Sequence, residues 1–182
     1  MERNEAIAIA EELGFSHTGL FDAAGLRFRT EVRDMCRADK CNKYNRTWTC
    51  PPACGTLDEI AERAAKYDWG ILVQTTGEME DAFDAETMME AMELQAERFM
   101  KFCDLLLERG EDCLPMGSGG CSLCERCTWP DEPCRFPERV HPSMEAYGLL
   151  VNDTCKLADT PYYYGKDTIT YTSCILFKEA SR

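Results

Sequence analysis

The sequence predicts an α/β protein, a single domain over residues 1–182 with a mixed sheet flanked by helices and two cysteine-rich loops. Segments with helical spacing of apolar residues alternate with short β-branched and aromatic runs, which is the pattern of this fold class. A length of 182 residues with 45% hydrophobic residues suffices for one ordinary core without disulfides. Twelve cysteines exceed what packing requires, so they need a chemical explanation.

The first half of the chain predicts helix, strand, helix and strand. Apolar residues recur at helical spacing over residues 4–13, and a short apolar run over 18–21 predicts a strand. Residues 56–59, Thr-Leu-Asp-Glu, form a capping box, and the helix that it starts is expected to run to about Tyr67. A buried strand over 69–75 follows.

The second half begins with the longest predicted helix, over about 84–108. Its inward stripe is expected to contain Ala85, Met88, Met92, Phe99, Cys103 and Leu106. Cys103 on this stripe is expected to be a small buried hydrophobe. A short strand is expected over 112–116, and Ser143 is expected to cap a helix of roughly fifteen residues. The β-branched run 168–177 predicts a strand, central because both of its faces are apolar.

The charge distribution limits the partners that the protein can have. A formal net charge of -13 argues against nucleic acid and anionic membranes, since both need concentrated Lys and Arg. Eight acids and no base occupy residues 78–97, which would suit a basic redox partner. Residues 33–54, by contrast, contain five basic and two acidic side chains.

Nothing in the sequence predicts export or a membrane span. The N-terminal segment has no uninterrupted apolar core, and no stretch approaches the length of a spanning helix. We therefore expect a cytoplasmic protein. In a reducing compartment, clustered thiols more often bind metal or do redox chemistry than form disulfides.

The downstream cysteines are spaced C-x2-C-x2-C-x6-C, at Cys121, Cys124, Cys127 and Cys134. The first three have the spacing at which one loop presents thiolates to three corners of a 4Fe-4S cluster. Structural zinc sites usually take ligands as separated C-x2-C pairs, so iron-sulfur is favoured over zinc. The long final gap leaves the fourth ligand open.

The upstream cysteines are Cys36, Cys41, Cys50 and Cys54, spaced C-x4-C-x8-C-x3-C. This spacing is compatible with a second cluster, with zinc, with a ligand lent to the first cluster, or with cysteines that are simply buried. A predicted helix start follows each cysteine group, at Thr56 and at Ser143.

The two groups also carry a family resemblance. Residues 35–56, with Cys50-Pro51-Pro52, and the segments Cys134-Arg135-Phe136-Pro137 and 142–148 resemble the predicted metal-binding family known as domain of unknown function 2284. The resemblance covers nearly the whole chain. It implies metal binding, with iron-sulfur favoured, in proteins typical of anaerobic microbes, and it implies no known reaction.

Three functions are compatible with these patterns. The leading hypothesis is an iron-sulfur protein that exchanges electrons with a partner protein, with one 4Fe-4S cluster downstream and a second upstream as the further expectation. An alternative is an enzyme whose cluster has one open iron that acts as a Lewis acid, helped by Arg126, Arg135, Arg139 or His141. The last is a zinc-binding module that interacts with another protein. The sequence does not indicate the substrate, the oligomeric state or the reduction potential.

Overall fold

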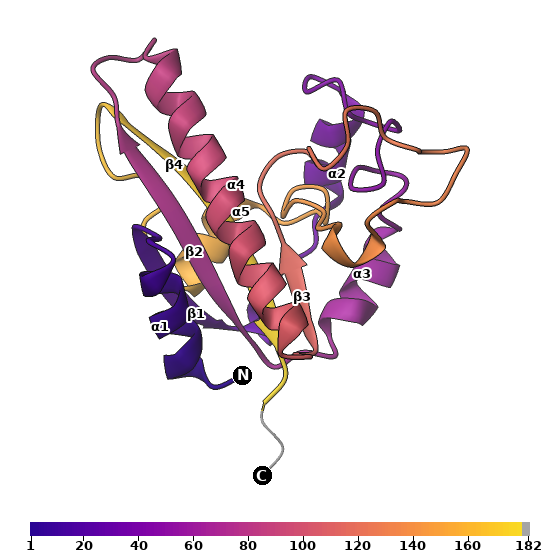
Figure 1. Cartoon of the computed structure of the whole chain (residues 1–182), viewed down its shortest axis with the longest axis horizontal. Helices are drawn as coiled ribbons and strands as arrows, with labels where there is room; N and C mark the ends of the chain where they lie inside the picture. Colours follow the sequence, from indigo (N-terminus) through magenta and orange to yellow (C-terminus); the bar gives the residue numbers. More distant parts are fainter. Residues whose placement is uncertain (180–182) are drawn as a thin grey trace.

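The computed structural model describes residues 1–179 and has the predicted α/β class (Figure 1). Helices and strands alternate along the chain, and most predicted elements are present. In chain order they are α1 (Arg3–Glu12), β1 (His17–Asp22), η1 (Ala23–Gly25), α2 (Thr30–Arg37), α3 (Leu57–Ala64), β2 (Trp69–Glu78), α4 (Ala85–Glu108), β3 (Cys113–Met116), η2 (Pro137–Arg139), α5 (Val151–Leu157) and β4 (Thr168–Phe177). Helix α2, which ends just after Cys36, was not predicted.

The four strands form one sheet in the order β1-β2-β4-β3. Strand β4 is internal, as predicted. All three strand pairs are antiparallel, whereas a mixed sheet was expected. The reason is that β2, α4 and β3 form a crossover between two strands of the same direction, and β4 inserts between them in the opposite direction. The only parallel pairing in the described chain is the isolated bridge between Gly117 and Ser143.

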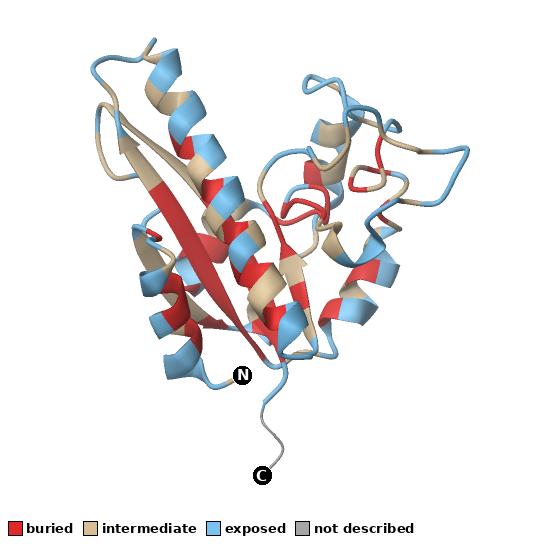
Figure 2. Cartoon of the chain, viewed as in Figure 1, coloured by how far each residue is buried: buried red, intermediate tan, exposed pale blue. Residues whose placement is uncertain are grey.

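Both faces of the sheet are covered, as Figure 2 shows by the red colour of the central strands. Helices α1 and α4 pack against one face, where Trp69, Ile71 and Val73 of β2 point. The opposite face, which includes Leu72 and Cys174, packs against α3, α5 and the segment 144–149. The cysteine-rich loops are therefore joined to the sheet through this second core.

Helix α4 begins at the predicted place, because the Asp84 side chain accepts a hydrogen bond from the Thr87 backbone N–H at 3.0 Å. The predicted inward stripe is correct at Phe99, Cys103 and Leu106 and wrong at Ala85 and Met92, which are exposed. The buried residues in the first half of α4 are instead Ala91 and Gln95.

Gln95 explains the shift of the stripe. The side-chain amide is buried, and it donates hydrogen bonds to the Val73 carbonyl at 3.3 Å and to the Ser173 hydroxyl at 3.0 Å. These two bonds satisfy the Nε2 donor and hold Gln95 in the core, so it interrupts the apolar pattern, although its Oε1 is buried with no hydrogen-bond partner among the described residues.

The prediction of a long helix from Ser143 was wrong. Ser143 caps a single turn, in which its hydroxyl accepts from the Ala146 N–H at 3.1 Å, and helix α5 begins only at Val151. Gly148 ends the turn in the left-handed region, at φ +84°, and Leu149 then forms a bridge with Phe28. The chain therefore crosses the core at the point where a continuous helix was expected.

Figure 1 shows two lobes that diverge from a common base. One contains β2, β4 and α4, and the other contains α2, α3 and the loops that carry the two cysteine groups. Among the helices of residues 1–179, none has the length and apolar character needed to cross a lipid bilayer.

Candidate metal centre

The upstream cysteines lie between α2 and α3. Cys36, Cys41 and Cys50 line one cavity of about 220 Å³ together with side chains that include Lys43. Cys54 does not line this cavity; it is only 7% exposed and belongs to the core. Three of the four upstream thiols thus face a common space, and the fourth lies behind it.

Cys54 and Cys36 both contact the turn that follows Ser143. The Cys54 thiol donates to the Ala146 carbonyl at 3.5 Å, and the Cys36 thiol donates to the Glu145 carbonyl at 3.8 Å. Burial raises the pKa of both thiols, and the Glu145 carboxylate raises that of Cys36 further. The broken helix therefore matters for the site, because it brings these carbonyls to the upstream thiols.

Arg33 of α2 connects the turn after Ser143 to the segment that carries Cys54. Its guanidinium donates to the Ala146 carbonyl at 2.7 Å and to the Gly55 carbonyl at 2.8 Å, and one of its nitrogens lies 3.7 Å from the Cys54 sulfur. This positive charge partly offsets the effect of burial on the pKa of Cys54. A fixed cation beside a thiol favours the thiolate, which is the form that binds metal.

The four downstream cysteines line a second, smaller cavity of about 20 Å³. They are Cys121, Cys124, Cys127 and Cys134. Burial raises the pKa of Cys121, and a hydrogen bond from the Leu123 backbone N–H opposes this rise. The Phe136 backbone N–H donates to the Cys134 sulfur at 3.4 Å. Each of these two sulfurs therefore receives an amide from the residue two positions later, an arrangement that stabilises thiolates and cluster sulfurs.

The two cysteine loops pack against each other. The Trp48 indole N–H donates to the Thr128 hydroxyl at 3.2 Å, and the Trp129 indole N–H donates to the Asn45 carbonyl at 3.2 Å. The two indole rings meet edge to face, with centroids 4.7 Å apart. These contacts join segments that are distant in sequence, and no local pattern predicts them.

The two thiol-lined cavities share a wall. Cys50 lines the larger cavity and its neighbour Thr49 lines the smaller one. Likewise, Gly120 lines the larger cavity and its neighbour Cys121 lines the smaller one. Thr49 is buried, and its hydroxyl lies 3.9 Å from the Cys50 sulfur. Thr49 was not predicted as part of the site, and its only signal in the sequence is its position directly before Cys50-Pro51-Pro52.

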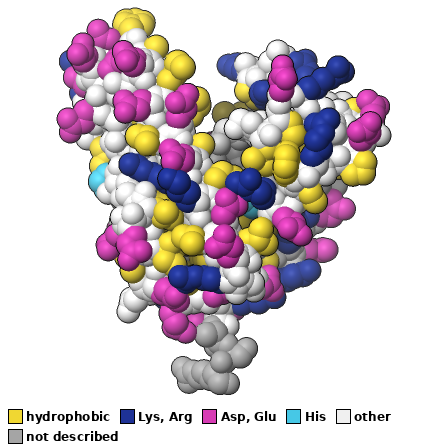
Figure 3. Space-filling view, viewed as in Figure 1, with side chains coloured by type: hydrophobic (Ala, Val, Ile, Leu, Met, Phe, Trp, Pro, Cys, Tyr) yellow, Lys and Arg dark blue, Asp and Glu magenta, His cyan; other side chains and the backbone are white. Residues whose placement is uncertain are grey.

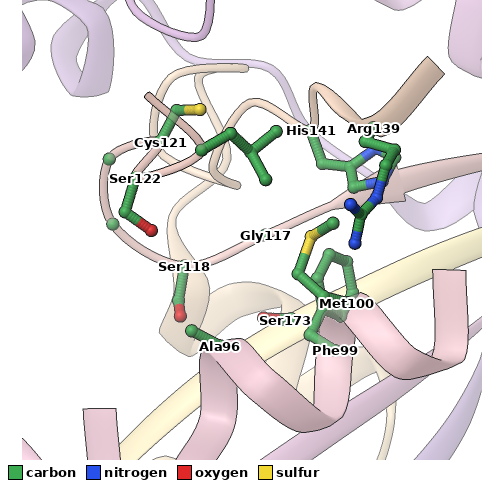
Figure 4. A pocket seen from close by; sticks show the side chains of 13 residues that line it. Ala96, Phe99, Met100, Gly117, Ser118, Cys121, Ser122, Arg139, His141 and Ser173 are labelled. Carbon is green, nitrogen blue, oxygen red and sulfur yellow. The ribbon is translucent and has the colours of Figure 1, made fainter. Parts of the chain in front are cut away.

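A third cavity, of about 70 Å³, lies on the other side of Cys121 and is shown in Figure 4. His141 and Arg139 lie on one side of it and Cys121 on the other, above Phe99 of α4. Arg139 is held by two hydrogen bonds to Asp104, at 2.9 and 2.8 Å. Burial lowers the pKa of His141 to about 4, so its ring is neutral near pH 7. His141 lines neither thiol-lined cavity.

The remaining four cysteines lie in or beside the two cores: Cys103, Cys113, Cys155 and Cys174. Burial raises the pKa of all four, to about 12 for Cys113 and about 11 for Cys155. A thiolate is unfavourable at these positions, so they are structural. This agrees with the prediction made for Cys103.

The donor sets fit a soft metal, and the two cavities differ in size. A volume of about 220 Å³ exceeds that of a single ion, whereas about 20 Å³ is close to the room that one water-sized atom needs. Within residues 1–179, no three His, Cys, Asp or Glu side chains converge closely enough to hold one metal ion. The upstream space is large enough for a multi-atom cluster, but its thiols would have to move together to bind one. The downstream loop would have to open to admit one.

An α/β fold that gathers seven cysteines around two adjacent cavities, with Cys54 buried behind the larger one, defines a class of cysteine-rich metal-binding proteins. The chain matches the family described as predicted metal-binding protein (DUF2284) over residues 19–177, and it belongs to that family. The family resemblance noted in the sequence is thereby confirmed. Neither the curated proteins nor the solved structures contain a match to this chain.

Proposed function

We propose that this protein is an iron-sulfur protein that exchanges single electrons with a partner protein. The observation that carries the proposal is the packing of two cysteine groups against each other around two cavities that share a wall. Thiolates in such numbers suit iron-sulfur clusters, which supply one-electron chemistry when bound. Two adjacent centres would also let an electron pass within the chain.

The surroundings of the thiols support the same proposal. Backbone N–H groups reach the sulfurs of Cys121 and Cys134, and Arg33 lies beside Cys54. Such donors stabilise negative charge on sulfur and so favour the more reduced state of a bound cluster. We infer that these residues tune the reduction potential.

Metal analysis after anaerobic purification tests the proposal. We expect iron and acid-labile sulfide in equal amounts, about four of each per chain for one cluster and about eight for two. Dithionite reduction should give an electron paramagnetic resonance signal. Cys124→Ala and Cys41→Ala should each lower the iron content, whereas Cys103→Ala, a change in the core, should not. Zinc without iron would refute the proposal.

A zinc-binding module is the second candidate, and the small downstream cavity favours it. A space of about 20 Å³ is close to the size of one ion, and four cysteines line it. In this case the purified protein would contain about one zinc per downstream site and no sulfide.

The third alternative, an open-site Lewis acid, depended on Cys134 failing to reach the cluster. Cys134 lines the same cavity as the other three downstream cysteines, which supports it as the fourth ligand and gives the open-site enzyme less support than the other two candidates.

A further inference from the structure

Acidic and basic side chains gather on different lobes of this protein. The formal net charge of -13 does not reveal this separation. Figure 3 shows acidic side chains gathered at the tip of the lobe formed by β2 and α4, and dark blue basic side chains at the top of the other lobe. The acids at the tip belong to the run of eight within residues 78–97. This tip lies on the lobe that does not carry the cysteine loops.

The segment from the end of α2 to Arg46, on this second lobe, carries exposed basic side chains at Arg37, Lys40, Lys43 and Arg46. Arg37 pairs with Asp34 at 3.1 Å, and Arg46 pairs with Asp39 at 3.2 Å. Lys40 is exposed and has no carboxylate within ion-pair distance in residues 1–179. Two of the cations on this segment are therefore balanced by nearby acids, and Lys40 keeps an uncompensated charge.

The same segment brings the upstream thiols nearest to solvent. Cys41 is exposed and also lines the cavity of about 220 Å³, and the neighbouring Met35 is 68% exposed. Lys43 is exposed as well and lines the same cavity. Lys40 thus places uncompensated positive charge beside an exposed thiol, and such charge attracts an acidic protein surface. We call this surface, with Met35, Arg37, Lys40, Cys41, Lys43 and Arg46, the Lys40 face.

We propose that the Lys40 face docks a small acidic one-electron carrier protein. This proposal rests on the proposed function and names the partner's chemistry. Electron tunnelling weakens steeply with distance, so a redox partner must dock beside the thiols and not at the acidic tip. Opposite charge at that face steers the encounter. The acidic surface, including the run 78–97, predicts a basic partner, whereas the proposal of an acidic partner rests on the separate charges of the Lys40 face.

The transfer itself involves one electron and no change of bonds. With a cluster held by Cys36, Cys41 and Cys50, the electron would pass from the reduced carrier to this protein, or in the reverse direction when the potentials require it. The carrier is oxidised by one electron, and this protein is reduced by one.

Binding of a plant-type 2Fe-2S ferredoxin, used as the acidic probe, tests the docking face. Affinity would be measured by calorimetric titration at low and at physiological ionic strength, with cytochrome c as the basic comparison probe. Lys40→Glu reverses the charge at the centre of the face. Lys166→Glu makes the same change at an exposed lysine outside the face and serves as the matched control. Both side chains are exposed, and circular dichroism would verify the fold of each variant.

We expect the ferredoxin to bind, its affinity to fall as salt increases, and Lys40→Glu to weaken it by about three- to tenfold at low salt, while Lys166→Glu leaves it nearly unchanged. Preferred binding of cytochrome c, or equal effects of the two variants, would overturn the inference. So would the absence of ferredoxin binding. Iron and sulfide content is measured separately, so a failure of the proposed function is distinguishable from a failure of the docking face.

Discussion

Gly148→Ala is expected to destabilise the protein and to disturb the upstream thiols. Gly148 lies at φ +84°, where an alanine is strained. A Cβ at this position would lie 2.5 Å from Cδ2 of Leu57 and 3.2 Å from the backbone oxygen of Arg29. The backbone oxygen cannot move without shifting the chain before α2, so the strain passes to both sides of the cysteine loop.

The magnitude follows from three contributions. The left-handed conformation costs about 1–2 kcal/mol for alanine, and overpacking costs about 1–3 kcal/mol. Alanine also lowers the conformational entropy of the unfolded chain, which offsets about 0.4–1 kcal/mol of this loss. The free energy of unfolding should therefore fall by about 1–4.6 kcal/mol.

Gly110→Ala is the matched control. Gly110 has φ +66°, but a Cβ there would meet nothing within 4 Å. It shares the strain and the entropy change without the clash, so Gly148→Ala should be about 1–3 kcal/mol more destabilising. Urea unfolding followed by circular dichroism measures both variants, and metal content reports the effect on the site. Equal losses of stability would refute the packing argument.

Three further predictions concern cysteine, arginine and histidine. Cys103→Ala should cost about 1–2 kcal/mol in urea unfolding because it leaves a small cavity, but the metal content should stay unchanged, unlike in Cys124→Ala. Arg33→Lys should cost about 1–3 kcal/mol, since a single ammonium cannot reproduce the fork that bonds two carbonyls beside Cys54; unchanged stability would contradict this role. Burial lowers the pKa of His141 to about 4, so the folded state binds fewer protons than the unfolded state and stability is lost as pH falls from about 6.5 towards 4. Between pH 7 and pH 5 the unmodified protein should lose about 2 kcal/mol more than His141→Gln in guanidinium unfolding, and parallel losses would show that His141 is not the cause.

Local chemistry determined the elements that the sequence predicted well. Asp84 caps α4, the capping box at Thr56 starts α3, and the β-branched run 168–177 forms an internal strand. In each case the signal lies within a few residues of the element. The burial of Cys103 belongs to the same group, because helical spacing alone places it on the inner face.

Interactions between distant residues determined what the sequence did not predict. Gly148 ends the turn in the left-handed conformation, at a place where a Cβ would meet Leu57 and Arg29, and Gln95 enters the core through bonds to two strands. Spacing identified both cysteine groups, but it did not reveal that Trp48 and Trp129 hold the loops together. The relation between the two groups is a property of the tertiary fold.

The shared wall between the two cavities would link metal uptake at the two cysteine groups, if both bind metal. Ordering Thr49 and Cys50 around one centre would also fix one side of the other cavity, and Gly120 and Cys121 would do the same from the opposite loop. Metal bound at one group would then carry part of the ordering cost of the other, and by thermodynamic linkage the effect would be reciprocal. Such a protein would fill both sites over a narrow range of metal concentration, with few half-loaded molecules.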